Sequence, residues 1–365
     1  MNPSNRVQLR PGAVLTFALL VTNAAFASTI TQNLSWTINR PGATTKYRVV
    51  AYGDSIFAGY HGSLSSVAKR AAPNVSAEYS QKAWNSNVEI YRRTKSGAVA
   101  SDIYNNKIVN ERSYMQAADT RVVMFEMCGN DFLQARSSFA GQSGTCNYGV
   151  IDTALANCTN YQTLAMQYIN ANANAATKVK MISNLYYPGY AADNKSSSCT
   201  DAGTGQPINL QTKFLPYIAR SNWRACNAAA QNGFACVDSF AQFMGADYDS
   251  NGDGLVDSDA LAWRAGETEA AYVTRITVTL RSTLRDANTH LANSSTAYDY
   301  LQSDDTHPTY SGGTVGVGFF GGTGSGSGAP DYTDAQIVGG KNPIWNHFGH
   351  ERMGWGAAEK SPATP

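Results

Sequence analysis

The chain has 365 residues, a formal net charge of +1 and only 15% charged residues. It contains no basic stripe with interleaved aromatic residues, which argues against nucleic acid as a partner. The length allows one large domain or two small ones, and we expect one because no linker-like tract divides the middle of the chain.

The first 27 residues have the features of a secretory signal peptide. Arg6 and Arg10 precede an apolar run from Ala13 to Phe26, and Ala25-Phe26-Ala27 has the small-x-small form of a cleavage site. The run is too short for a stable membrane span, which makes a retained anchor the less favoured alternative. We therefore expect residues 1–27 to be a signal peptide and residues 28–365 to be one secreted domain, extracellular or periplasmic, without a membrane span.

Short apolar runs alternate with helical periodicity along the rest of the chain. Apolar residues at helical 3–4 spacing cover residues 151–168 and 276–291. We expect strands over Tyr47 to Tyr52, Val88 to Tyr91, Arg121 to Met127, Val179 to Leu185 and Phe234 to Val237. Strands separated by helices predict an α/β fold with a parallel sheet covered on both faces. Working residues in such sheets gather at the carboxyl ends of the strands.

Reactive side chains follow three of the apolar runs. Gly53-Asp54-Ser55 comes directly after the first expected strand, Gly129-Asn130-Asp131 comes after the third, and Asp304 and His307 follow a short apolar run near the end. A serine hydroxyl becomes a nucleophile when an imidazole takes its proton and a carboxylate orients that imidazole. Backbone N–H groups and an amide side chain can hold the oxyanion that develops. The three segments therefore predict acyl transfer.

These segments resemble the blocks of the GDSL esterase and lipase family, also called SGNH hydrolases. The first block of that family looks like Gly53-Asp54-Ser55-Ile56, the third like Gly129-Asn130-Asp131 and the last like Asp304-Asp305-Thr306-His307-Pro308. Its second block is a glycine after the next strand, which we place at Gly97. The resemblance implies a flavodoxin-like three-layer α/β/α fold with a central parallel sheet, no catalytic cofactor, and hydrolysis of carboxylic esters or thioesters.

The resemblance also implies roles for single residues. Ser55 would be the nucleophile, His307 the base and Asp304 its orienter, with Asp305 as the alternative orienter. The oxyanion hole would consist of the Ser55 N–H, the Gly97 N–H and the Asn130 amide. Each residue has a structural alternative, because serine often caps helices, Asx residues close turns, and glycine is frequent in this chain. A G-x-S-x-G motif is absent around Ser55, which argues against an α/β-hydrolase fold.

The even number of cysteines suggests disulfides in an exported protein, rather than metal sites or catalytic thiols. Cys146 with Cys158, and Cys199 with Cys226 or Cys236, would close modest loops, although the sequence does not choose among the pairings. Cys128 could remain a free thiol.

A run of oxygen-bearing side chains between Asp247 and Asp259 is typical of a calcium loop. A register that starts at Asp249 puts Gly254 at loop position six. The ligands would then be Asp249, Asn251, Asp253, the Leu255 carbonyl, Asp257 and Asp259. The twelfth position holds Ala260 instead of the glutamate of an EF-hand, so the loop resembles those of dockerins and thrombospondin repeats. We expect structural calcium, and the alternative is an acidic turn without metal.

Two features near the C-terminus have weaker signals. The glycine-rich segment 312–331 is expected to be a flexible loop near the site. His347 and His350 could suggest a metal pair, but the H-E-x-x-H order is missing, so we expect a packed C-terminal helix instead.

The sequence therefore predicts a secreted serine hydrolase that cleaves a lipid, small or glycan ester. One alternative is a carbohydrate O-acetyl esterase, in which aromatic side chains could stack on sugar rings. Candidates for that stacking are Trp84, Tyr186, Tyr187 and Trp223. Another alternative is a non-catalytic, calcium-dependent surface-binding module.

Overall fold

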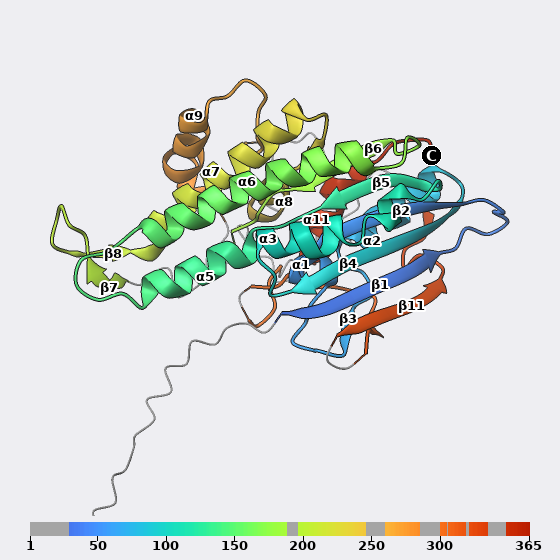
Figure 1. Ribbon diagram of the computed structural model, residues 1–365, viewed down its shortest axis with the longest axis horizontal. Coiled ribbons are helices and arrows are strands. Elements are labelled where there is room, and N and C mark those ends of the chain that lie inside the picture. Colours follow the sequence, from blue (N-terminus) through green and yellow to red (C-terminus); the bar gives the residue numbers. More distant parts are fainter. Residues whose placement is uncertain are drawn as a thin grey trace, which may run out of the picture.

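A seven-stranded sheet forms the centre of the protein in the computed structural model (Figure 1), which describes residues 29–187, 196–245, 260–284, 300–304, 306–318, 321–334 and 348–365. Its strands, in spatial order, are β11 (Gly322–Gly328), β1 (Ile30–Ile38), β4 (Asn87–Ser96), β2 (Lys46–Gly53), β5 (Thr120–Phe125), β6 (Val179–Ser183) and β9 (Ala235–Val237). Two small sheets pair β3 (Ser66–Ala68) with β10 (Thr314–Gly316) and β7 (Ser196–Thr200) with β8 (Pro207–Asn209).

Helices connect most of these strands. They are α1 (Ser55–Ala58), α2 (Ala72–Ala83), α3 (Ala100–Asp102), α4 (Ser113–Gln116), α5 (Gly129–Ala140), α6 (Gly149–Asn172), α7 (Leu210–Gln231), α8 (Ser239–Met244), α9 (Glu269–Thr274) and α11 (Gly349–Lys360), with π-helical segments at Ile103–Val109 and Arg275–Thr279 and a 3-10 turn at Arg281–Thr283. The periodicity over 151–168 corresponds to α6. The helix expected over 276–291 is shorter in the described residues, where it ends as a π-helical segment and the 3-10 turn.

The five expected strands are confirmed as β4, β2, β5, β6 and β9, and they are parallel to one another. When these five strands are numbered in chain order, they lie side by side in the sheet as 2-1-3-4-5, which is the flavodoxin-like order. The order reverses between β2 and β5. Ligands of open α/β sheets bind at this switch point, outside the carboxyl ends of the strands.

Two further strands extend the sheet beyond the five expected ones. β1 runs antiparallel to β4, and β11 pairs with β1 in parallel. β10 and β11 both belong to the glycine-rich segment, so the prediction of a flexible loop there is wrong for residues 314–316 and 322–328. Strand pairing uses backbone groups, which glycine supplies as well as any other residue.

The sheet is covered on both faces, which gives the three layers of the expected α/β/α fold. Val50 and Tyr52 of β2 join a core with α6 and α7, whereas Val49 and Ala51 point to the opposite core, which α2 and α11 cover. This alternation follows from the two-residue period of a strand. The C-terminal helix is packed as expected, because His350 of α11 is fully buried and its Nδ1 accepts the Ala72 N–H at 3.4 Å. His347 lies outside the described residues.

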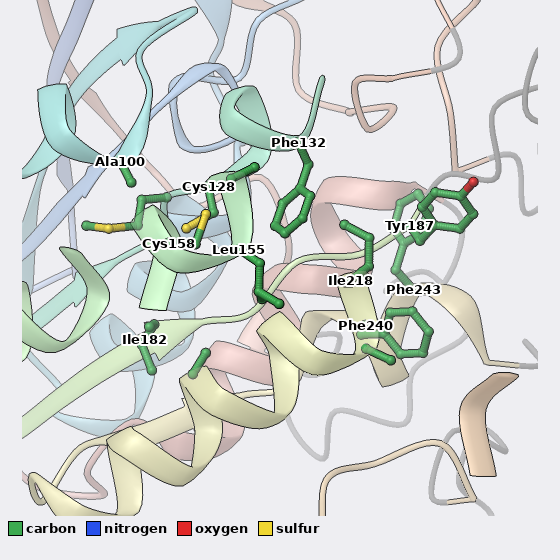
Figure 2. Packing of buried hydrophobic residues seen from close by; sticks show 14 of the residues in the cluster. Ala100, Cys128, Phe132, Leu155, Cys158, Ile182, Tyr187, Ile218, Phe240 and Phe243 are labelled. Carbon is green, nitrogen blue, oxygen red and sulfur yellow. The ribbon is translucent and has the colours of Figure 1, made fainter. Parts of the chain in front are cut away.

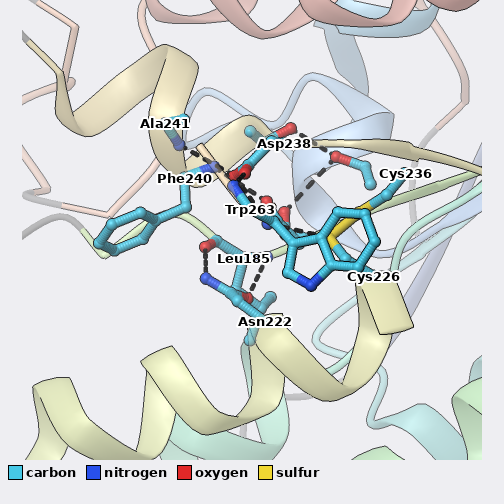
Figure 3. Close-up of a disulfide and its surroundings, with 11 residues drawn as sticks. Leu185, Asn222, Cys226, Cys236, Asp238, Phe240, Ala241 and Trp263 are labelled. Carbon is cyan, nitrogen blue, oxygen red and sulfur yellow. Dashed lines mark hydrogen bonds between the residues drawn. A yellow bond between two sulfur atoms is a disulfide. The ribbon is translucent and has the colours of Figure 1, made fainter. Parts of the chain in front are cut away.

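Two disulfides form, between Cys146 and Cys199 and between Cys226 and Cys236 (Figure 3). The suggested Cys146–Cys158 pairing is therefore wrong. Cys146 lies in the loop before α6, where its N–H donates to Thr200 O at 2.8 Å, and this places it beside Cys199. Cys226 lies on α7 and is bridged to β9, the next strand, rather than to Cys199.

Several expectations concern residues that the structure does not describe. The signal peptide, the aspartate-rich segment 247–259 and Asp305 lie outside the described residues, so the predictions about them remain predictions. No helix in the described part of the chain is both long and apolar enough to cross a membrane.

Candidate active site

Three of the four sequence blocks meet at the carboxyl edge of the sheet, around the switch point. Ser55 follows the end of β2, Gly97 follows the end of β4, and Gly129 and Asn130 begin α5 shortly after β5. Because β2 lies between β4 and β5, the turn that carries Ser55 lies between the other two.

The Ser55 turn is closed by its own neighbours. Asp54 caps α1 by accepting the Ile56 N–H at 2.9 Å, and the Tyr60 N–H donates to the Ser55 carbonyl oxygen at 3.0 Å. Asp54, and not Ser55, is therefore the cap of this helix, so capping does not explain the serine. Ser55 is 8% exposed. Within the described residues, neither its hydroxyl nor its N–H donates a hydrogen bond.

The Asn130 side chain lies beside the turn that contains Gly97. Gly97 has φ +78°, a left-handed conformation that glycine adopts without strain, and its N–H has no hydrogen-bond acceptor among the described residues. The Asn130 amide nitrogen donates to Ala98 O at 3.0 Å and to Asp54 Oδ2 at 3.1 Å. The Asn130 amide is thus fixed between the Gly97 turn and the Ser55 turn, and it closes neither turn by itself.

Asp304 and His307 form a pair inside a tight loop. The Asp304 Oδ2 lies 2.6 Å from His307 Nδ1, while its Oδ1 accepts the N–H groups of Thr306 and His307 at 3.0 and 2.9 Å. The short apolar run before the pair does not form a strand of the sheet, and the loop is instead closed by an isolated bridge between Leu301 and Pro308.

Tyr60 and Gln302 attach this loop to the Ser55 turn. Gln302 Nε2 donates to Tyr60 O at 2.9 Å and to Pro308 O at 2.7 Å, and the rings of Tyr60 and His307 pack with centroids 4.8 Å apart. No hydrogen bond joins the Ser55 hydroxyl to His307 among the described residues. Such bonds are often long in structures without substrate and shorten when substrate binds.

The carboxyl groups near the site differ in their environments. Partial burial raises the pKa of Asp304, but the hydrogen bonds from the His307 ring and backbone outweigh it and lower the pKa to about 2. Burial raises the pKa of Asp131 to about 7, although the Ala100 N–H that it accepts at 2.8 Å opposes this. Asp304 is therefore ionised at neutral pH, as an orienter of imidazole must be.

Sequence reasoning missed three residues of the site: Tyr60, Gln302 and Glu126. Glu126 is buried at the end of β5, and its Oε1 accepts the Asp54 N–H at 2.6 Å. A charged residue directly after a buried apolar strand was the signal that could have found it. Tyr60 and Gln302 have no such signal.

The aromatic residues considered for sugar stacking are mostly structural. Trp84 and Tyr187 are buried in two different cores. Trp223 Nε1 donates to Glu267 O at 2.8 Å, and the Tyr186 hydroxyl donates to Thr306 O, beside His307. Tyr186 therefore lies next to the candidate site through a hydrogen bond.

Comparisons with known proteins give low similarity throughout. No protein-family model and no curated protein matches the chain. Among solved structures, it is similar to a lipase from a goat rumen metagenome at 17% identity and TM-score 0.42, covering 65% of this chain and 98% of the other. Phospholipase A1 from Streptomyces albidoflavus is 17% identical with a TM-score of 0.39, covering 66% of this chain and 100% of the other. An acetylxylan esterase from Geobacillus stearothermophilus is 12% identical with a TM-score of 0.34, covering 67% of this chain and 95% of the other.

The roles of the site residues depend on their own sequence order and geometry. The four blocks occur in the family's order, from Gly53 to Pro308. Three of them lie together at the switch point, and the fourth is attached there through Gln302 and Tyr60. In its sequence blocks and in its α/β fold, the chain resembles the SGNH hydrolases.

Proposed function

We propose that the chain is a secreted serine hydrolase of carboxylic esters, with Ser55 as nucleophile, His307 as base and Asp304 as its orienter. One linked set of contacts supports this most. Asp304 holds Nδ1 of His307, the His307 ring packs on Tyr60, and the Tyr60 N–H binds the carbonyl oxygen of Ser55. This leaves Nε2 of His307 as the ring atom that can accept the Ser55 proton.

The reaction has two halves. His307 Nε2 takes the proton of Ser55 as Oγ attacks the ester carbonyl, and the same proton is then given to the leaving alcohol as the C–O bond breaks. Water, deprotonated by His307, attacks the acyl-enzyme. The carboxylic acid leaves and Oγ regains its proton.

The oxyanion would be held by the N–H groups of Ser55 and Gly97 and by the Asn130 amide. The two backbone N–H groups have no other acceptor in the described part of the chain. Asn130 already donates to Ala98 and Asp54, so it would share one of these two hydrogens with the oxyanion. A backbone pair with one side-chain donor is a usual composition for such a site.

The test uses purified protein with p-nitrophenyl acetate and butyrate, and a fluorophosphonate that labels activated serines. We expect turnover and a single label on the peptide that contains Ser55, both lost in Ser55→Ala with the melting temperature unchanged. A protein that turns over neither ester and takes no label would contradict the proposal. That result would favour the non-catalytic, calcium-dependent module.

A groove between α5 and α6 gives a reason to consider the carbohydrate ester as a second candidate. It has a volume of about 610 Å³, and it begins at Val99 and Asp131, next to the Gly97 and Asn130 turns. Half of its lining residues carry uncharged polar side chains, namely Ser101, Gln134, Ser138, Asn147, Thr153 and Asn157. Amides and hydroxyls of this kind suit the hydroxyl groups of a sugar better than an acyl chain.

The two substrate classes can be separated directly. Release of acetate from an acetylated xylan would support the glycan ester, and hydrolysis of long-chain p-nitrophenyl esters would support the lipid ester. In Asn157→Ala, the KM for the glycan should rise while the kcat for p-nitrophenyl acetate stays the same. Equal KM values of the wild type and Asn157→Ala on the glycan would contradict a role of the groove.

A further inference from the structure

Two buried carboxylic acids, Asp54 within the Ser55 turn and Glu126 beside it, have no lysine or arginine partner among the described residues. Asp54 is 1% exposed and Glu126 is 4% exposed. The Asp54 N–H donates to Glu126 Oε1 at 2.6 Å, and the Glu126 N–H donates to Tyr52 O at 3.0 Å. No lysine or arginine of the described residues forms an ion pair with either acid. The pair therefore holds its charge without compensation from a permanent cation.

The close approach of Glu126 also explains the glycine of the first block. A Cβ atom at Gly53 would clash with Glu126 Oε1. The glycine is needed because the carboxyl group occupies the space where a side chain would be. The Glu126 carboxyl group thus packs directly against the backbone of the Gly53-Asp54-Ser55 turn.

Two carboxyl groups in contact cannot both be ionised in a buried site without a large cost. Burial, followed by the negative charge of Asp54, raises the pKa of Glu126 well above its ordinary value. Burial also raises the pKa of Asp54, but hydrogen bonds from Ile56, Glu126 and Asn130 oppose that shift. Glu126 is therefore the acid that keeps the proton, and its O–H donates to the Asp54 carboxylate.

Asp54 connects Glu126 to the site through two further hydrogen bonds. Its Oδ1 accepts the Ile56 N–H at 2.9 Å, which fixes the first turn of α1, and its Oδ2 accepts the Asn130 amide at 3.1 Å. We propose that Glu126, as a neutral acid hydrogen-bonded to Asp54, is a positioning residue that holds the Ser55 turn and the Asn130 amide in register. This inference rests on the proposed function, in which Ser55 and Asn130 do the chemistry.

The groups that face the pair give the inference a pH dependence. His307 faces Asp54 from the loop of residues 300–309, and Asp131 and the Cys128 thiol face the pair from the start of α5. Of these groups, only His307 can carry a positive charge. Ionisation of Glu126 would place a second negative charge beside Asp54, and the turn would be pushed apart. Activity should then fall reversibly on the alkaline side.

The experiment compares Glu126→Gln with Glu126→Ala on p-nitrophenyl butyrate between pH 6 and 10. Glutamine imitates the neutral acid, because its oxygen accepts the Asp54 N–H and its NH₂ donates to the Asp54 carboxylate. We expect Glu126→Gln to keep most of its kcat at pH 7 and to lose the alkaline fall. Glu126→Ala should lose kcat on the order of a hundredfold, with a smaller change in KM, because the reacting groups are misplaced.

A stability measurement tests the shared proton independently of activity. An acid whose folded pKa is raised destabilises the fold as pH rises above the unfolded pKa, here from about pH 4.5 upward. The melting temperature of the wild type should therefore fall relative to that of Glu126→Gln as pH rises from 5 to 9. If no ester is hydrolysed but this difference appears, the function is wrong and the proton sharing stands. Identical pH profiles of kcat and melting temperature in the wild type and Glu126→Gln would overturn the inference.

Discussion

Asp304 and His307 are joined twice: the Asp304 Oδ2 lies 2.6 Å from the His307 ring nitrogen Nδ1, and its Oδ1 lies 2.9 Å from the His307 backbone nitrogen. One carboxylate therefore fixes both the loop conformation and the orientation of the imidazole. Because Nδ1 carries the hydrogen that Asp304 accepts, the lone pair of the ring is on Nε2.

Asp304→Asn should remove catalysis while keeping the loop. The asparagine oxygen can still accept the two backbone N–H groups, but its NH₂ would face Nδ1 and force the hydrogen onto Nε2. Nε2 could then no longer accept a proton from Ser55. We expect kcat to fall by about ten-thousandfold, as for other triads with the wrong tautomer, with little change in melting temperature.

Asp305→Asn is the matched control for this substitution, because Asp305 is the alternative orienter and lies outside the described residues. It should retain wild-type kcat. A large loss in Asp305→Asn with an active Asp304→Asn would reverse the assignment.

Because the Asp304 pKa is about 2 and lies below its ordinary value, the pair stabilises the fold above about pH 4. This stability is lost as pH falls toward 2.

Asn130→Ala separates a catalytic role from a structural one. Loss of one oxyanion donor lowers kcat by on the order of a hundredfold with little effect on KM. The melting temperature should fall as well, because Asn130 is buried and bonds Ala98 and Asp54. Asn105→Ala, which removes an exposed amide bonded to Ser101 O, should change neither quantity. A drop in melting temperature without loss of kcat would contradict the oxyanion role.

The parallel strands could be predicted because each is a short run of β-branched and apolar residues. β1 was missed because polar residues interrupt its pattern and are buried anyway. Gln32 accepts the Ser96 hydroxyl at 2.6 Å, and Asn33 accepts the Thr94 N–H at 3.0 Å, so both are satisfied by β4. Such pairing depends on a neighbouring strand about sixty residues away, which a local pattern does not contain.

Some residues of the candidate site could likewise be predicted from the local sequence, and others could not. Ser55 and Asn130 were predictable because parallel strands bring their carboxyl ends to one edge. The contact of Gln302 with Tyr60 joins residues 242 positions apart, and no local pattern encodes it. Glu126 could have been noticed as an acid beside a buried strand, but its proton sharing depends on the distance to Asp54. Disulfide pairing likewise followed the three-dimensional positions of β7, α7 and β9 and of the loop before α6, rather than loop length.

Calcium should raise the melting temperature through the aspartate-rich segment 247–259, whose ligands lie outside the described residues. Carboxylates gathered at one site repel one another unless a cation binds them. EDTA should therefore lower the melting temperature, and added calcium should restore it while magnesium does not, because magnesium demands stricter geometry. Asp253→Ala should abolish the difference. An identical melt with EDTA and with calcium would show that the segment is an acidic turn without metal.

Cys128 and Cys158 should be thiols that react only after unfolding. Both are fully buried, and Figure 2 shows their sulfur atoms side by side between α5 and α6. Burial raises the pKa of Cys158 to about 11 and raises that of Cys128 well above its ordinary value. Because the thiolate is the reactive form, iodoacetamide at pH 8 should not modify the native protein.

Intact-mass measurement counts these thiols directly. Unreduced protein in urea should take up two carbamidomethyl groups, since four of the six cysteines form disulfides. Reduced protein in urea should take up six. Cys158→Ala, as the matched variant, should take up one group in urea without reduction, located at Cys128. No uptake by the unreduced wild type in urea would mean that the two sulfur atoms are bonded to each other, because unfolding exposes every free thiol.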